Sequence, residues 1–538
     1  MKIKSLLIGM LASTAFVACT NDVETVENGA VAKGEKSYVA VNLVTPNAGS
    51  RAGETPSYKN GSGDEVKVGK IRFYFFGDNG DAYQVTDADH ETPANYIEIN
   101  NPTLNQNTPV NSNVDKISDA VLVINKSKIA PPKSVVAVIN ADKLTELGKG
   151  SLSLTQLTNA IYNVKEGIAG TGENQFIMSN SVYVDAAGNT VVATPITMDN
   201  VCKAVGNGNE DGALDHPINI YVERVVAKVS TGNLKVGQTF DTGAEFGGKK
   251  VYAQIKGWAI TNYNDESYLF KSLEGNSAWT SLSFTWNAPV DFRSFWAKSA
   301  TPTTGETYNA TYKNDHAYNT LTSVNEKYCL ENTSNNPTQL LVAATLVTKN
   351  GEKYEPLEIA QWMGVKYTVE GLKEQLAGTL ASDYYYYDST DKKYKSITKD
   401  HIAFENPENN WSADEKRYTV KAVVASNAPK FFVKNGEDME ELTANTEINT
   451  KLAKYPVLIW TGGATYYFLP IKHINTENGI VRNHLYDITI NGVASFGTPV
   501  YNPEEIILPQ TPEDDETYIS AKINILSWKV VSQSVTLK

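Results

Sequence analysis

The sequence predicts an all-β protein built from antiparallel β-sandwiches. Many short segments alternate apolar with polar residues, and the connections between them are rich in Asn, Thr, Ser and Gly. Helical periodicity is confined to two short segments, 155–162 and 369–376. Strands that follow one another without intervening helices favour antiparallel sandwiches over parallel βαβ units. A chain of 538 residues is long enough for two or more domains, each with its own core.

The chain is acidic, with a formal net charge of −13 at pH 7. Proteins that bind nucleic acid present a basic surface, so this charge argues against a nucleic-acid partner. It also argues against electrostatic binding to anionic lipid.

The N-terminus has the features of a secretion signal. Lys2 and Lys4 precede the apolar segment Leu6–Val17, which is too short to span a membrane as a mature helix. Small or apolar residues stand directly before Cys19, and this pattern resembles a bacterial lipobox, in which the cysteine becomes the lipidated N-terminus. The alternative is an ordinary signal peptide that happens to be followed by Cys. We expect 1–18 to be a signal peptide and the mature chain to have no transmembrane helix.

The first strand of the mature chain is joined to an unusual loop. Val39, Val41 and Leu43 alternate with smaller or polar residues, so one face of this strand is apolar. A loop rich in Pro, Asn, Gly and Ser follows, and it carries one basic residue, Arg51. A buried strand tied to an exposed basic residue is the arrangement expected of a strand that is cut away.

Most of the rest of the first half is predicted to form strands. The segment Ile218–Val229 is the longest clean strand, and its alternation shifts near Glu223 and Arg224, which predicts a bulge or bend. We expect a domain boundary just after it, near Gly232. The other strand candidates in this half are 68–76, 121–124 and the continuously apolar 135–139, which we expect to be buried on both faces.

The second half repeats this organisation. One helix is expected at 369–376, with Thr368 as its cap. The strand candidates are 251–260, 340–346, 419–424, 457–460, 465–469 and 484–490.

The chain closes with a further alternating strand. Ile519, Ala521, Ile523 and Ile525 share one face, the alternation slips at Leu526, and Trp528 continues in the new register. The linker before this strand, 503–515, is acidic and rich in proline, so we expect it to hold the strand away from the body of the protein.

The sequence contains no convincing catalytic, metal or cofactor motif. The six histidines are scattered and match no metalloprotease or Cys/His spacing. The loop Asn207–Gly212 follows the start of a calcium loop, but Ile218 stands where a bidentate Glu is needed, so a polar hairpin is the alternative. Cys202 and Cys329 cannot make a metal site by themselves, and one disulfide between them is possible but cannot be deduced. We therefore expect no enzyme, no metal and no cofactor.

A series of short motifs in a fixed order carries a family resemblance. They are the lipobox at Cys19, Arg51 in the loop after the first strand, 132–140, 178–181, 222–228, 257–258, 295–297, 328–333, 480–484 and 525–528. The chain resembles the fimbrillins, the shaft subunits of type V pili, and within them is most similar to the minor-fimbria shaft subunits.

The resemblance implies a defined series of processing and assembly steps. Fimbrillins have two transthyretin-like β-sandwich domains, here 52–232 and 233–500, behind a lipidated propeptide, 19–51. They are carried to the outer membrane as lipoproteins, and an arginine-specific protease cuts between the residues matching Arg51 and Ala52. The groove left by the first strand then accepts the C-terminal strand of a neighbouring subunit, here within 501–538.

The implied partners are identical subunits in a filament, accessory tip and anchor pilins, the processing protease, and a host or bacterial surface receptor. The implied location is a cell-surface fimbria, with the precursor anchored by its lipid to the outer membrane. Two alternatives stay open, a pilus tip or anchor subunit and a surface glycan-binding lipoprotein.

Overall fold

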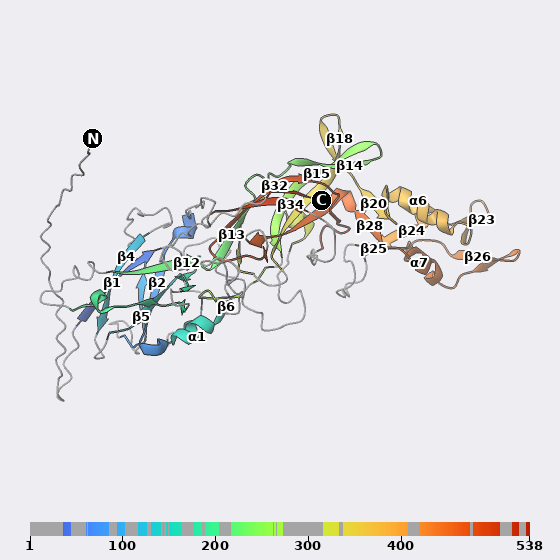
Figure 1. Cartoon of the computed structure of the whole chain (residues 1–538). Coiled ribbons are helices and arrows are strands. Elements are labelled where there is room, and N and C mark those ends of the chain that lie inside the picture. The colour runs from blue at the N-terminus through green and yellow to red at the C-terminus, as the bar shows by residue number, and fades with distance from the viewer. Residues whose placement is uncertain are drawn as a thin grey trace, which may run out of the picture.

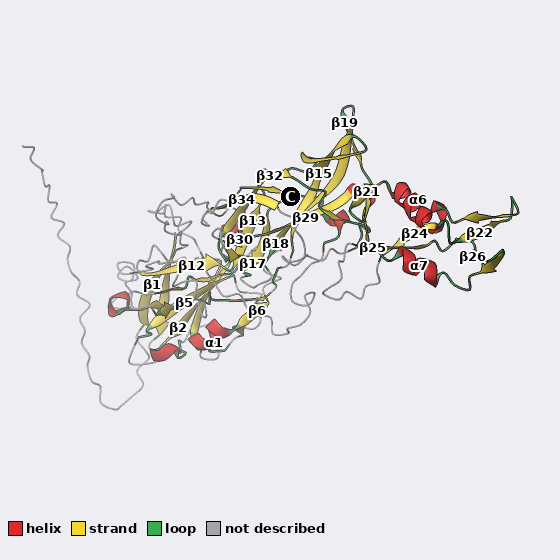
Figure 2. Cartoon of the chain, turned by 45° about the vertical axis from the view of Figure 1, so that its right-hand side comes forward, coloured by secondary structure: helices red, strands yellow, loops and turns green. Residues whose placement is uncertain are grey.

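A computed structural model of the chain describes residues 36–44, 61, 63–85, 94–102, 117–125, 131–140, 144, 147–148, 150–163, 176–184, 189–203, 217–261, 263–264, 266–272, 316–332, 337–406, 419–473, 477–505, 519–526 and 534–537. The described part is elongated, with the first sheet at one end and the helices α6 and α7 toward the other (Figures 1 and 2). Strands dominate throughout, so the prediction of an all-β fold with a few short helices is confirmed.

The first domain is built on a nine-stranded sheet in the order β11-β1-β12-β7-β5-β2-β3, with β4 paired to β1 and β10 paired to β5. Its strands are β1 (Lys36–Val44), β2 (Lys70–Phe76), β3 (Tyr96–Asn100), β4 (Ile117–Asn125), β5 (Ser134–Ile139), β7 (Met178–Asn180), β10 (Thr194–Pro195), β11 (Cys202–Lys203) and β12 (Ile218–Arg224).

The centre of this domain is a continuous apolar core. Residues 135–139 of β5 are each at most 1% exposed, which confirms that this strand is buried on both faces. The helix α1 (Leu154–Asn159) begins with a capping box at Ser153 and places Leu157 in the core. The helix expected at 155–162 is therefore shorter than predicted, because Ile161–Asn163 form β6, which pairs with another strand.

The segment Ile218–Val229 passes from the first domain to the second. β12 ends at Arg224 and β13 (Val226–Ser230) begins after the single intervening residue Val225, so the predicted irregularity lies at this step. β12 belongs to the first sheet and β13 to a second one, so the two sheets are joined by one nearly continuous segment (Figure 1).

The second domain is a sandwich of two sheets. One sheet has the order β17-β13-β32-β34-β35, and the other has the order β14-β15-β18-β29-β33 with β19 paired to β18. Side chains from both sheets, such as Tyr486 and Ile488 from the first and Ile255 and Val342 from the second, form a shared core. The strands are β14 (Thr239–Phe246), β15 (Lys249–Thr261), β17 (Lys327–Leu330), β18 (Gln339–Asn350), β19 (Lys353–Pro356), β29 (Ala464–Pro470), β32 (Leu485–Val493), β33 (Thr498–Pro499), β34 (Ile519–Leu526) and β35 (Ser534–Leu537).

A third group of elements lies beyond the sandwich and has a separate core. Leu372 and Leu376 of α6 (Val369–Leu380) pack there with Ile448 of α7 (Thr446–Leu452). Thr368 caps α6 as predicted, and the helix extends four residues past the predicted end. Two sheets complete the group, β21-β20-β28-β25-β24 and β23-β22-β26-β27. Their strands are β20 (Ile359–Trp362), β21 (Val365–Tyr367), β22 (Tyr385–Asp388), β23 (Lys393–Ser396), β24 (Ile402–Glu405), β25 (Thr419–Val424), β26 (Phe431–Asn435), β27 (Asp438–Glu441) and β28 (Val457–Trp460).

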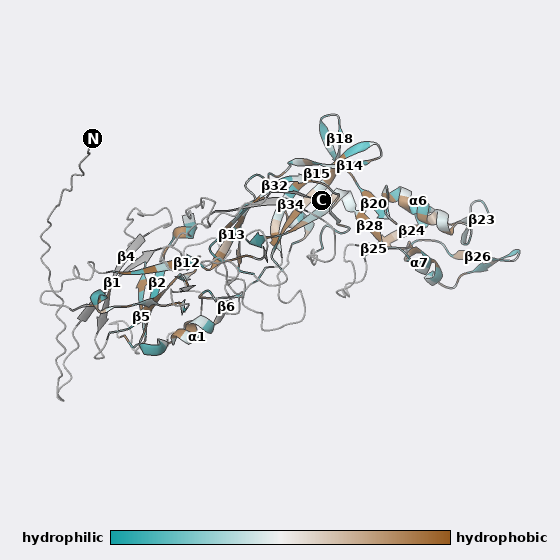
Figure 3. Ribbon diagram, viewed as in Figure 1, coloured by the Kyte–Doolittle hydropathy of each residue, from teal (hydrophilic) through white to brown (hydrophobic). Residues whose placement is uncertain are grey.

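Hydropathy follows burial in the strands that follow the first domain. β20 and β28, whose buried residues include Ile359 and Val457, are brown in Figure 3, whereas the projecting ends of β14 and β18 are teal. Among the described residues, no helix is long and apolar enough to cross a membrane.

Candidate assembly site

The first strand lies inside the first sheet and has neighbours on both sides. β1 pairs antiparallel with β4 over its whole length, from Lys36 opposite Asn125 to Val44 opposite Ile117. On its other side β1 pairs parallel with β12, and its beginning pairs antiparallel with β11. The strand chosen from its alternation alone is thus an interior strand of the sheet.

The register aligns the apolar positions of β1 with buried positions on its neighbours. Val41 lies opposite Ile218 and Leu43 lies opposite Ile220 on β12, while Val39 lies opposite Leu122 on β4. Ile218, Ile220 and Leu122 are 3%, 0% and 1% exposed. Residues directly opposite each other on paired strands share a face. Val39, Val41 and Leu43 therefore occupy positions on the face of the sheet that covers the core.

The last strands pair within the second domain. β34 runs antiparallel to β32, with Ile523 opposite Ile488 and Ile525 opposite Tyr486. Ile488 and Tyr486 are fully buried in the sandwich core, so the alternation of β34 matches the inner face of its own sheet. The prediction that this strand is held away from the body is wrong. The structure places β34 beside β32, because the same alternation that suits a donated strand suits this position.

The structure describes some of the remaining predicted site residues and not others. Ile519 and Ala521 lie in β34, opposite Leu537 and Ser534 of β35. Cys19, Arg51, Ala52, Trp528 and the loop Asn207–Gly212 lie outside the described residues.

The two mature-chain cysteines lie in different sheets. Cys202 belongs to β11 of the first sheet, where it pairs with Tyr38, and Cys329 belongs to β17 in the second domain. Cys329 is a free, buried thiol, and burial raises its pKa to about 12. In the parts of the chain that the structure describes, no group of three or more His, Cys, Asp or Glu could hold a metal ion.

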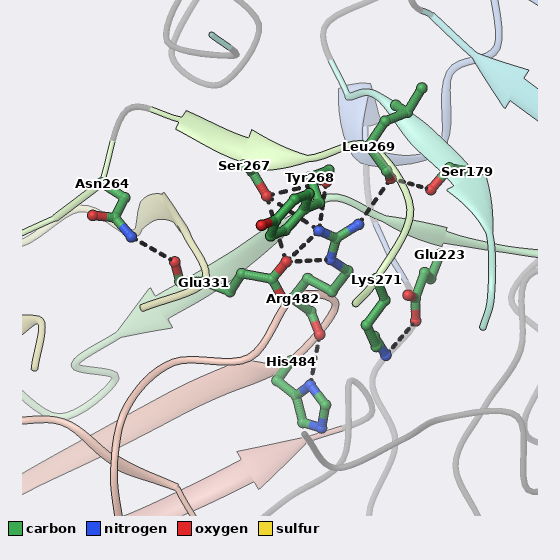
Figure 4. Close-up of polar contacts among 10 residues, drawn as sticks. All are labelled: Ser179, Glu223, Asn264, Ser267, Tyr268, Leu269, Lys271, Glu331, Arg482 and His484. Atoms are coloured by element: carbon green, nitrogen blue, oxygen red, sulfur yellow. Dashed lines mark hydrogen bonds and ion pairs between the residues drawn. The ribbon is translucent and has the colours of Figure 1, made fainter. Parts of the chain in front are cut away.

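A buried arginine organises the junction between the two domains (Figure 4). Arg482 and Glu331 are both completely buried, and Arg482 Nε donates to Glu331 Oε1 at 2.9 Å. The guanidinium also donates to the backbone oxygens of Leu269 at 2.9 Å and Tyr268 at 2.7 Å and to Ser267 Oγ at 3.1 Å. A buried charge of this kind is stable only because it is paired and hydrogen-bonded.

A second buried ion pair lies beside it. Lys271 Nζ lies 2.9 Å from Glu223 Oε2, and both side chains are 1% exposed. Glu223 comes from β12, and Ser181 Oγ donates to the same carboxylate oxygen at 3.3 Å. Burial lowers the pKa of Lys271, while Glu223 opposes this shift.

A third group of polar contacts joins the first domain to β13 and β17. Glu65, in the 3₁₀ turn Gly63–Val66, accepts from Lys228 Nζ at 2.8 Å and from the hydroxyl of Tyr328 at 2.5 Å. Arg224 Nε donates to the backbone oxygen of Glu65 at 2.8 Å. Burial, together with the hydrogen bond to Glu65, raises the pKa of Tyr328.

These ion pairs do not follow from the sequence pattern. The sign of the contacts on this segment is that three charged residues, Glu223, Arg224 and Lys228, interrupt the mostly apolar segment 218–229. Charged residues are rarely buried unless they are paired, and their partners here come from distant parts of the chain.

Comparison with known proteins identifies the segment that contains β32 and β34. Residues 459–534 match the family model described as major fimbrial subunit protein type IV, fimbrillin, C-terminal. The resemblance to fimbrillins is confirmed. The fimbrillin match supports a fimbrial subunit role at the cell surface.

Two solved structures from Parabacteroides distasonis are similar over most of their length. One is described as a candidate cell adhesion protein, with 11% identity, coverage of 92% of this chain and 97% of that chain, and a TM-score of 0.37. The other is a fimbrial assembly protein, with 9% identity, coverage of 75% and 97%, and a TM-score of 0.27. TM-scores this low support no conclusion about fold or function. No curated protein matches the chain.

Proposed function

We propose that the chain is a shaft subunit of a cell-surface fimbria and that it polymerises by donor-strand exchange. The observation that carries this proposal is that β1, the strand directly before Arg51, is paired on both sides inside the first sheet. A fimbrillin segment in the same chain supports the fimbrial role. In this scheme the precursor is lipidated at Cys19, and an arginine-specific protease cuts between Arg51 and Ala52.

Loss of β1 leaves a vacant position between β4 and β12, which we call the slot. Its two edges carry unpaired backbone N–H and C=O groups, which favour pairing with another strand. Ile218, Ile220 and Leu122 lie opposite β1, so the removal of β1 exposes the apolar face beside them. Burying an Ile or Leu side chain contributes about 1.5–3 kcal/mol. A subunit with an empty slot therefore has a strong tendency to bind an alternating apolar strand.

The proposed replacement is β34 of a neighbouring subunit. Its residues Ile519, Ala521, Ile523 and Ile525 repeat at every second position, as the pockets along a sheet face require, and Trp528 follows in a new register after the slip at Leu526. Donation requires β34 to leave β32, so the strand exchanges one apolar sheet face for another. Donor and acceptor are different surfaces, so the contact is heterologous, and it extends into a filament where the rotation between successive subunits does not close a ring.

The N-terminal residue of the protein on the cell surface tests this proposal. We expect Ala52, because the shaft scheme removes β1. Cys19 at the N-terminus of the assembled protein would contradict the scheme and favour an anchor subunit or a surface glycan-binding lipoprotein that keeps its lipid. A tip subunit and a shaft subunit differ in their position in the filament, and immunogold labelling distinguishes the two. Shaft subunits label along the whole length, and they carry the adhesive contact with a surface receptor.

A further inference from the structure

A short segment of the second domain reaches back into the first. After β15 ends at Thr261, β16 (Glu266–Tyr268) pairs antiparallel with β6 (Ile161–Asn163) of the first domain. Leu269 and Phe270 follow, each 1% exposed, and both belong to the core of the first domain. We call residues 266–271 the strap.

Both domains hold the strap through buried polar contacts (Figure 4). From the second domain, Arg482 binds the backbone oxygens of Tyr268 and Leu269. From the first domain, Ser179 Oγ donates to Leu269 O at 2.6 Å, and Glu223 pairs with Lys271 at 2.9 Å. A strap fixed by buried charges on both sides cannot detach without exposing its apolar residues and separating desolvated ions.

The strap is attached to the same strand that borders the slot. On β12, residues Ile218–Tyr221 pair with β1, and Glu223, two residues farther along, pairs with Lys271 of the strap. The next contact of this strand within the first sheet is β7, opposite Val222–Arg224. When β1 is removed, Ile218–Tyr221 lose their partner on that side, whereas the ion pair at Glu223 remains.

We propose that the strap holds β12 in position while the slot beside it is empty. The buried pair between Glu223 and Lys271 fixes the end of β12 nearest the domain junction, and Arg482 fixes the strap to the second domain. β12 then meets an incoming strand already extended and in register, which reduces the ordering that binding requires. That the slot becomes empty rests on the proposed function. The pairing of β1 with β12 does not, because it is observed in this chain.

The test uses a chain that begins at Ala52 and carries Asp487→Cys with Asn524→Cys, which lie opposite each other on β32 and β34 and form a disulfide that keeps β34 out of a neighbour's slot. The ligand is a synthetic peptide of residues 36–44. The double variant Glu223→Met and Lys271→Met removes the ion pair and keeps apolar volume, a replacement that buried pairs commonly tolerate. Hydrogen exchange across 218–224 is expected to rise about tenfold or more in this variant, and the peptide is expected to bind about tenfold more weakly. In the full-length chain, where β1 is present, the same substitutions should change exchange in this segment far less.

The matched control is Asp241→Met with Lys250→Met, an exposed pair, which should alter neither readout. If the buried double variant does not fold, Ser179→Ala removes one contact to the strap and should shift both readouts in the same direction with a smaller size. Unchanged exchange and unchanged peptide binding in a folded variant overturn the proposal. A peptide of residues 517–528 that fails to bind, while 36–44 binds, counts against donor-strand exchange and leaves the strap proposal intact.

Discussion

The first and last strands have similar alternation but are held very differently. β1 is paired with β4 at all nine positions and with β12 and β11 on its other edge. β34 is paired with β32 at five positions and with β35 at only two. Each backbone hydrogen bond contributes about 0.5–1.5 kcal/mol net, so β1 is the more firmly held strand. This difference explains why the scheme needs a proteolytic cut to remove β1 but only release to donate β34.

The largest expected effect comes from blocking the cut. Arg51→Ala should abolish filaments, because β1 then stays in the slot and no neighbouring strand can enter. Electron microscopy and the N-terminal residue of the accumulated precursor measure this outcome. A chain that starts at Ala52 serves as the control and should polymerise without the protease. Normal filaments from Arg51→Ala would show that β1 need not be removed.

A charge on the apolar face of the donated strand should act almost as strongly. Ile523→Asp places a carboxylate at a position that must be buried in the acceptor, so elongation should stop, as seen by loss of high-molecular-weight ladders. Lys522→Asp, on the opposite face of β34, is the control and should still polymerise. Equal elongation by both variants would place the donor strand elsewhere.

Shortening a buried side chain of the slot should destabilise the first domain to a measurable degree. Ile220 is fully buried, and Ile220→Ala should lower the free energy of unfolding by about 2–5 kcal/mol. Urea denaturation followed by circular dichroism reports the change. Asn219→Ala, at an exposed position of the same strand, should cost far less. A loss below about 1 kcal/mol at Ile220 would mean that the face beside β1 is not part of the core.

The smallest expected effect at neutral pH is that of Cys329, whose contribution changes only at alkaline pH. Burial raises the pKa of its thiol from 9.0 to about 12, so between these values the unfolded chain loses this proton while the folded chain keeps it. The thiol's contribution to stability is fully present below pH 9 and is lost as pH rises toward 12, by up to roughly 1.4 kcal/mol per pH unit. Cys329→Ala should show a shallower decline in urea titrations over this range. Identical slopes would mean that the thiol titrates normally.

Local patterns predicted the elements better than their arrangement. The apolar run 135–139 and the capped helix at Val369 follow from burial and capping rules that act within a few residues. The pairing of β1 with β4 and β12 depends on segments far away in the chain, which periodicity does not report. The helix α7 was missed, although Ile448 and Leu452 are spaced one turn apart, because it has only seven residues.

In the candidate site, too, the local pattern was predictable from the sequence and the long-range pairing was not. Val39, Val41 and Leu43 could be chosen from alternation, and the structure adds which buried residues lie opposite them. The pairing of β34 with its own β32 could not be foreseen, since an alternating strand fits any complementary sheet face. The junction around Arg482 could not be foreseen either, because a charged side chain is ordinarily expected at the surface.

The most direct test of donor-strand exchange mixes two chains that each keep one half of the contact. The acceptor chain begins at Ala52 and carries Asp487→Cys with Asn524→Cys, which lie opposite each other on β32 and β34 and form a disulfide that holds β34 in its own domain. The donor chain is Arg51→Ala, whose slot stays occupied. We predict that neither chain polymerises alone, that the mixture forms one-to-one dimers and nothing longer, and that reduction of the disulfide lets the acceptor chain form filaments. Filaments from the oxidised acceptor chain alone, or no dimers in the mixture, would contradict the account.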